Sequence, residues 1–427
     1  MGRATPTRIR RDLAAVVGDA HVRDAGPKDA VDGSLPRWVV EPGSVQEAAA
    51  VLAFCLGRDL AVVPRGAGTK IGWGNPPGRL DVVVSTARLD GLLDHAAGDL
   101  VVRVQAGMPL ARLQERLADA GQMLALDPPE QGATVGGVVA ANASGPRRHR
   151  YGTARDLVIG VTVVLADGTV ARAGGRVVKN VAGYDLMKLY AGSLGTLGLI
   201  AELAFRLHPV PAASRTVLAR VPGPPEAGRL QQALLDSALV PSAMELAWSD
   251  PGGPVEVAVR FEGIEPGAAG QARQAAEIAA AHGEDHVLAG GEERVVWERI
   301  AAVPWGPGEV GLKVAAVPAT LAAALEALRD SATGHGVGLR VGGRAGAVVL
   351  LAALSGEDPA VAEVVRDVRR AVAVDGGSAV LLQAPAGMRR AVDAWGPAGD
   401  ALGLMRRVKA RFDPTGIMAP GRFVGGI

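Results

Sequence analysis

The sequence of 427 residues has one cysteine, 3% aromatic residues and almost no net charge. A single thiol, Cys55, cannot form a disulfide within the chain, and it cannot supply the roughly four thiolates of an iron–sulfur cluster. With Lys+Arg 45 against Asp+Glu 44, no strongly basic domain points to nucleic acid. The low cysteine content fits a reducing compartment.

Long apolar runs are also missing. Stretches such as residues 347–354 have the length of a strand, whereas a membrane-spanning helix needs about 20 apolar residues. The N-terminus has arginines but no apolar core of a signal peptide. The seven histidines are scattered without a carboxylate pattern that completes a metal site, so we expect no metal. We predict a cytoplasmic protein without direct membrane insertion, associated with membranes only through partners.

Glycine, in contrast, is abundant, with 58 residues, and the chain is long enough for two or more domains. Glycines gather in PRGAGTK (residues 64–70) and in several clusters between residues 127 and 211. Glycine turns leave backbone N–H groups accessible, and successive N–H groups form a concave site for anions. The pattern therefore predicts a large anionic cofactor.

For two of these glycine clusters, the sequence predicts how they bind the anion. In PRGAGTK, the backbone is predicted to hold phosphate, with charge added by Arg65 and Lys70; the alternative is a tight turn between strands. In ATVGGVVAANASG (residues 133–145), a helix N-terminus is predicted to face the anion. A side chain at Gly136 should then occupy ligand volume, unless the glycines only allow a helix to pack closely on a sheet. The basic run RRHRYG (residues 147–152) is either a clamp for pyrophosphate or a solvated loop.

The remaining pattern predicts an α+β protein. Residues 45–57 and 109–120 have helical spacing, and residues 158–173 read as a hairpin around Asp167-Gly168. Residues 208–214 look like a linker. Beyond it, strands near residues 215–221, 255–261, 310–314 and 347–353 alternate with helices near residues 225–237, 268–282, 319–331 and 359–372. No internal repeat is visible.

The chain contains, in this order, the motifs PRGAGTK, DPP, TVGG, NASG, RYG and GTLG. This order of motifs resembles that of the vanillyl-alcohol-oxidase or PCMH-type FAD-binding domain. Two longer segments further resemble the FAD-binding subunits of bacterial glycolate oxidases. They are GGRVVKNVAGYDLMKLYAGSLGTLGLI (residues 174–200) and RRVKARFDPTGIMAPGRF (residues 406–423). The resemblance implies an N-terminal segment (1–34), a PCMH-type FAD-binding domain of two α/β subdomains (35–211), an α+β cap domain with an antiparallel sheet (215–400), and a C-terminal helix and tail returning to the FAD domain (401–427).

The resemblance also implies FAD bound non-covalently, because Thr69 stands where covalent-flavin relatives have a histidine. The pyrophosphate would be held by the backbone of residues 65–69, and Ile200 would bind through its backbone. The implied cofactor-binding residues are Arg65, Gly66, Ala67, Gly68, Thr69, Lys70, Pro128, Thr134, Gly136, Gly137, Asn142, Ser144, Gly145, Gly152 and Ile200.

For activity, the resemblance implies flavin-mediated oxidation of glycolate or a similar small 2-hydroxyacid, with a homologous FAD subunit and an iron–sulfur subunit as partners. Two departures stand out: GHGVGLRVGG (residues 334–343) lacks the Asp-Gly-Asn ending of related caps, and Ala419 replaces an asparagine. A non-catalytic flavin-carrying or scaffold subunit, and a free-standing oxidase of a sugar or lactone, are therefore alternatives.

A substrate carboxylate needs a cation, best an arginine fork. Candidates in the cap domain are Arg260, Arg299, Lys313, Arg340 and Arg344, of which Arg299, Lys313 and Arg344 are the predicted catalytic residues. The alternative for each is a surface salt bridge. No general base is nominated.

Overall fold

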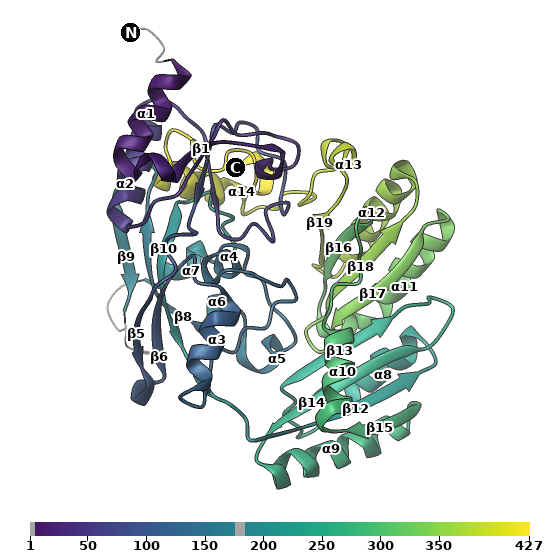
Figure 1. Cartoon of the computed structure of the whole chain (residues 1–427). Coiled ribbons are helices and arrows are strands. Elements are labelled where there is room, and N and C mark those ends of the chain that lie inside the picture. The colour runs from purple at the N-terminus through teal and green to yellow at the C-terminus, as the bar shows by residue number, and fades with distance from the viewer. Residues whose placement is uncertain (1–4, 176–183) are drawn as a thin grey trace. The chain divides into compact units, whose positions relative to one another are not determined.

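A computed structural model describes residues 5–175 and 184–427 and separates them into two compact units. The first unit comprises Met1–Ala143, Thr153–Val210 and Pro397–Ile427, and the second comprises Ser144–Gly152 and Pro211–Gly396. The chain therefore crosses between the units several times (Figure 1). Part of the segment GGRVVKNVAGYDLMKLYAGSLGTLGLI, namely residues 176–183, lies outside the described residues.

In the first unit, a four-stranded sheet has the order β1-β2-β4-β3, in which β2, β4 and β3 are parallel. Its strands are β1 (Val22–Asp24), β2 (Trp38–Val40), β3 (Val62–Arg65) and β4 (Val82–Ser85). The valine-rich strands β2 and β4 are buried along their whole length, as expected for parallel strands covered on both faces. Helices α1 (Pro6–Val17) and α2 (Val45–Leu56) share the apolar core of this sheet.

The second sheet of this unit is antiparallel, with the order β5-β6-β10-β8-β9. Its strands are β5 (Leu92–Ala96), β6 (Val101–Gln105), β8 (Val158–Val164), β9 (Val170–Gly174) and β10 (Leu199–Arg206). Strands β8 and β9 confirm the predicted hairpin. The expected linker at residues 208–214 is wrong in part, because β11 (His208–Pro209) pairs with β7 (Gln122–Met123) and β12 begins at Ala213.

The first unit also contains the helices α3 (Leu110–Ala118), α4 (Val135–Ala141), α6 (Ala154–Leu157), α7 (Met187–Tyr190) and α14 (Leu402–Phe412). Helix α3 buries Leu110, Leu113 and Leu117 on one face, as its spacing predicted. Helix α14 and the chain that follows it return to the first unit, so the last residues of the sequence lie beside some of the first.

The second unit is built on one antiparallel sheet of eight strands, which confirms the antiparallel sheet predicted for it. The order is β15-β12-β14-β13-β17-β18-β16-β19. The strands are β12 (Ala213–Val221), β13 (Ala243–Trp248), β14 (Val255–Gly263), β15 (Glu284–Leu288), β16 (Val310–Ala315), β17 (Gly338–Arg344), β18 (Val349–Ser355) and β19 (Ser378–Gln383).

Each half of this sheet has the same β-α-β-β-α-β order. The first half runs from β12 to β15 with α8 (Pro224–Leu235) and α9 (Glu265–Ala280), and the second from β16 to β19 with α11 (Leu321–Gly334) and α12 (Asp358–Ala373). The strand order is mirrored about the β13–β17 pair. The structure therefore contains a repeated topology that the sequence did not reveal.

The four helices α8, α9, α11 and α12 share one hydrophobic core with the sheet (Figure 1). On the other face, α10 (Gly290–Ile300) packs through Trp297 and Ile300 against Ala243 and Ala258. Two further helices, α5 (Arg148–Tyr151) and α13 (Ala386–Ala391), are short. Helix α10 covers only part of the sheet face that lies away from α8, α9, α11 and α12. The rest of this face is therefore available to charged side chains.

Among the described residues, no helix is long and apolar enough to span a membrane. Within the same residues, no three histidine, cysteine or acidic side chains gather in a way that could hold a metal ion.

Candidate cofactor-binding site

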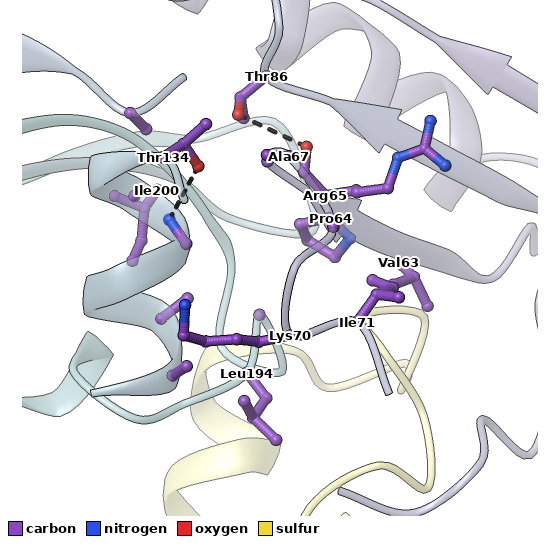
Figure 2. Close-up of a pocket in the computed structure, with 18 of the residues that line it drawn as sticks. Val63, Pro64, Arg65, Ala67, Lys70, Ile71, Thr86, Thr134, Leu194 and Ile200 are labelled. Atoms are coloured by element: carbon purple, nitrogen blue, oxygen red, sulfur yellow. Dashed lines mark hydrogen bonds between the residues drawn. The ribbon is translucent and has the colours of Figure 1, made fainter. Parts of the chain in front are cut away.

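A cavity in the first unit brings together the two glycine motifs that the sequence singled out (Figure 2). The cavity is partly open to solvent. Of the predicted cofactor-binding residues, those that line it are Arg65, Gly66, Ala67, Gly68, Thr69, Lys70, Thr134, Gly136, Gly137 and Ile200. The two glycine motifs, about 70 positions apart in the sequence, therefore line one cavity.

The loop after β3 lines this cavity, and it contains consecutive backbone amides that have no hydrogen-bond partner within the described residues. In the described part of the chain, no acceptor is bonded to the backbone N–H groups of residues 66–70, which we call the amide loop. Gly68 has a φ of 80°, a conformation that side chains rarely adopt. Because such a run of N–H groups forms an anion site, the residues present fit a cofactor phosphate at this loop.

The start of α4 differs from expectation, because its amides already have partners. The N–H groups of Val135 and Gly136 donate to the carbonyl oxygens of Met108 and Ala106, at 2.9 and 2.8 Å. Gly137 donates to the Thr134 hydroxyl at 3.3 Å. The prediction that this helix N-terminus offers free N–H groups to an anion is therefore wrong for residues 135–137, whereas the amide loop does offer such groups.

Gly136 also has a different role from the predicted one. A Cβ atom at this position would lie 2.6 Å from the Ala106 Cβ and 2.8 Å from the Ala106 carbonyl oxygen. It would thus collide with the protein rather than fill ligand volume. The glycine lets α4 pack against the chain after β6, which was the alternative interpretation of this motif.

We therefore predict that Gly136→Ala destabilises the fold, by the roughly 1–3 kcal/mol typical of an overpacked core. At the neighbouring Gly137, a Cβ would meet only the Thr134 hydroxyl, at 3.1 Å, so Gly137→Ala should leave stability nearly unchanged while adding a methyl group to the cavity wall. Urea unfolding of the two variants tests this difference. Equal stability of Gly136→Ala and the wild type would contradict it.

The two cations of the loop are already paired with carboxylates. Arg65 donates to Asp29 at 3.0 Å, and Asp29 also binds Arg23 through two contacts of 2.6 Å. Lys70 lies 2.9 Å from Glu130 and is almost fully buried. In Figure 2 the Arg65 guanidinium points away from α4, whereas Lys70 extends toward it. The predicted charge of Arg65 and Lys70 is therefore partly neutralised.

Hydrogen bonds from Arg23, and then from the Gly26 N–H and Arg65, hold the pKa of Asp29 well below its usual range. A carboxyl whose pKa is lowered by folding contributes stability above its unfolded pKa of about 3.9, and that stability is lost as pH falls below it. We predict that Asp29→Asn is less stable than the wild type at pH 7 and loses less stability between pH 5 and pH 2. Urea midpoints across this range measure it.

The matched control is Asp59→Asn, because Asp59 forms a two-contact pair with Arg79 at 2.8 Å but is exposed. Exposed pairs are screened by water and contribute little. The account of Asp29 fails if the two variants show the same dependence on pH.

The other predicted cofactor residues do not line this cavity. Asn142 ends α4 in a left-handed conformation, and its side-chain oxygen accepts the Arg155 N–H at 3.2 Å. Pro128 is half-buried in the loop before Glu130. Ser144, Gly145 and Gly152 belong to the second unit, where Ser144 accepts hydrogen bonds from Arg148 and Arg344. Their predicted contacts with cofactor stay predictions.

Residues from the C-terminal tail were missed as cavity residues. Arg422, 2% exposed, lines the cavity although it is far from the glycine motifs in sequence. The Lys409 ammonium binds the Thr196 carbonyl in the turn GTLG, the Asp413 carboxylate and the Met418 carbonyl, at 2.8, 2.6 and 2.8 Å. Only the resemblance of the tail to glycolate oxidase subunits pointed to this region.

In the second unit, a cluster of cations stands on the sheet face away from α8, α9, α11 and α12. Strand pairing places Lys313 opposite Leu351, Leu351 opposite Gly342, and Arg344 two residues beyond Gly342 on the same face. Arg344 is buried and donates to the Ser144 carbonyl, and the Arg148 side chain donates to the Ser144 hydroxyl at 3.3 Å. The Glu245 carboxylate lies 3.9 Å from the Arg344 guanidinium.

Two features suit this cluster to an anionic ligand. Burial, followed by repulsion from Arg148 and Arg344, lowers the pKa of Lys313, which has no carboxylate partner among the described residues. A Cβ on Gly342 would have only the Leu246 carbonyl oxygen within 4 Å among the described residues, at 3.6 Å, so no side chain touches that position.

The remaining cap candidates have partners of their own. Arg299 forms an ion pair with Glu256 at 2.6 Å and is half exposed, so the structure gives it the surface salt bridge that was the alternative. Arg260 binds Glu293 and stacks on Trp297, and Arg340 binds Glu309. Of the three predicted catalytic residues, the structure therefore brings together only Lys313 and Arg344, and it adds Arg148.

Comparison with known proteins connects these sites to a family. An FAD binding domain model matches residues 36–174, and a model of the C-terminal domain of FAD linked oxidases matches residues 257–423. Glycolate oxidase subunit GlcD of Bacillus subtilis (strain 168) is 32% identical over 50% of this chain and 45% of its own length. Glycolate oxidase subunit GlcE of Escherichia coli (strain K12) is 43% identical over 29% of this chain and 36% of its own.

Each of these alignments thus covers less than half of the relative. Among solved structures, p-cresol methylhydroxylase with bound substrate has a TM-score of 0.77 at 15% identity and covers 97% of this chain and 96% of its own, which supports the fold alone. The two family models, the PCMH-like fold and the glycine-lined cavity agree with one another. The chain therefore belongs to the FAD-linked oxidase family, with a PCMH-type FAD-binding domain followed by the C-terminal domain of these oxidases.

Proposed function

We propose that this chain is the FAD-binding subunit of a glycolate oxidase-type complex that oxidises a small 2-hydroxyacid, with glycolate to glyoxylate as the leading reaction. The observation that carries the proposal is the amide loop, a run of backbone N–H groups without acceptors in a loop that lines the cavity. The similarity to GlcD and GlcE supports the glycolate substrate and a homologous FAD subunit as partner. An iron–sulfur subunit is proposed as the electron acceptor.

In this proposal the residues of the chain divide into two groups. The backbone of residues 66–70 binds the pyrophosphate, and Gly137 and Ile200 form the cavity wall beside it. In the second unit, Lys313 and Arg344, with Arg148, bind and orient the substrate carboxylate. FAD, when bound, supplies the two-electron redox chemistry, while the protein supplies position and electrostatics.

The test is the visible spectrum of the purified chain, recorded without oxygen before and after glycolate is added. A flavin spectrum that glycolate bleaches supports a catalytic subunit. If bleaching requires a co-purified partner, the chain is an accessory flavin carrier, which was one of the alternatives. A protein that binds no FAD contradicts the proposal. Other 2-hydroxyacids and a sugar lactone, tested in the same way, rank the substrates.

A further inference from the structure

The amide loop is held on both sides by the end of the chain. Before the loop, residue 62 of β3 pairs with the tail: the Val62 N–H donates to the Ile417 carbonyl at 2.8 Å, and the Ala419 N–H donates to the Val62 carbonyl at 2.7 Å. After the loop, the N–H groups of Asn75 and Gly78 donate to the carbonyls of Arg422 and Pro420, at 3.0 and 2.9 Å.

The Arg422 side chain makes the closest link. Its guanidinium donates to the carbonyl oxygens of Ile71 and Trp73, the first at 2.6 Å, and the residue is 2% exposed. Ile71 directly follows the amide loop, and its own N–H donates back to the Gly68 carbonyl at 3.0 Å. Arg422 thus fixes the residue that closes the loop, and it lines the same cavity.

A second set of contacts holds the tail itself. The buried Asp413 carboxylate accepts the N–H groups of Ile417 and Met418, at 3.1 and 2.8 Å. Lys409 joins the same carboxylate to the Thr196 carbonyl, next to Gly195 and Gly198 of the cavity wall. The tail therefore connects the segments that flank the amide loop with the turn at residues 195–198, which also lines the cavity.

We infer that the tail, residues 413–422, positions the amide loop for the cofactor, with Arg422 as the positioning residue, so that tail docking and FAD binding stabilise each other. Two events that share a structural element are linked reciprocally: if the docked tail tightens FAD binding, bound FAD must stabilise tail docking by the same factor. This inference rests on the proposed binding of pyrophosphate at residues 66–70.

The first test is amide hydrogen exchange of the wild-type chain with and without FAD. With FAD at about 100 times its Kd, exchange through opening of the tail should slow by up to about 100-fold at Asn75, Gly78 and Ala419, in parallel with protection of residues 66–70. Protection of residues 66–70 alone overturns this inference but leaves the proposed function intact. No protection at residues 66–70 overturns both.

The second test measures the Kd of FAD from flavin fluorescence. Arg422→Gln should weaken binding at least about tenfold, and Arg422→Lys, which keeps a donor and the charge, should restore part of it. The matched control is Arg411→Gln, an exposed arginine of α14 that should leave the Kd unchanged. Wild-type affinity in a folded Arg422→Gln variant overturns the inference. If that variant does not fold, the exchange experiment on the wild type decides.

Discussion

Replacing Lys409 by methionine should destabilise the first unit by about 3–5 kcal/mol, the cost of leaving one partner of a buried ion pair behind. The partner, Asp413, has a fully buried side chain and lies 2.6 Å from the Lys409 ammonium. Burial lowers the pKa of Lys409, although the bond to Asp413 opposes this shift. The lysine also satisfies two backbone carbonyls, so its loss leaves a carboxylate and two acceptors without their cation.

Chemical unfolding monitored by circular dichroism measures this effect. Arg411→Met on the same helix is the control, because an exposed cation should change stability by no more than about 0.5 kcal/mol. The double variant Lys409→Met/Asp413→Asn should recover part of the loss, since it leaves no uncompensated charge. A single variant as stable as the control would show that the pair does not hold the tail.

The second large effect concerns Lys313, whose substitution should improve protein stability but impair substrate binding. Because folding lowers the pKa of Lys313, its charged form is disfavoured in the native state, and Lys313→Met should make the protein more stable at neutral pH. The same variant loses the proposed contact with the substrate carboxylate, worth about 2–5 kcal/mol for a buried charge pair. The KM for a 2-hydroxyacid should therefore rise roughly 30-fold or more.

This combination separates a binding cation from a structural one. If Lys313 has a structural role, its substitution should make the protein less stable. If Lys313 is a ligand-binding cation held among other cations, its substitution should make the protein more stable but less active. Arg299→Gln is the control for KM, because Arg299 is occupied by Glu256. If Lys313→Met lowers stability and leaves KM unchanged, the cluster is not the carboxylate site.

Much of the fold follows from the sequence because many elements carry a clear local pattern. Helix α12 has apolar residues at helical spacing, and residues 158–173 contain a hairpin signal. Strand β17 gave no such signal, since GLRVGGR is rich in glycine, yet it pairs with β13 and β18 in the middle of the sheet. Strand β15, EDHVL, is a polar strand at the edge of the sheet, where it pairs with β12. Tertiary pairing, rather than local preference, forms both.

The candidate site was predictable to a similar degree. Glycine spacing identified the amide loop, because glycine has no side chain to cover its backbone N–H group and can adopt the conformations that such a loop needs. What the sequence could not show was which groups were already paired. Asp29, Glu130 and the carbonyl of Ala106 neutralise or occupy groups that looked available, and each is distant in sequence from its partner. Arg422 contacts Ile71 across 351 positions, beyond any local pattern.

The measurement that tests the account most directly is the affinity of the FAD-free chain for FAD compared with riboflavin, which has the same ring but no phosphate. Hydrogen bonds to a charged group contribute about 1.5–3 kcal/mol each, so two or more amides of residues 66–70 on the pyrophosphate predict FAD binding at least about 100-fold tighter. Equal affinities for the two flavins would contradict the claim that these backbone amides bind the cofactor.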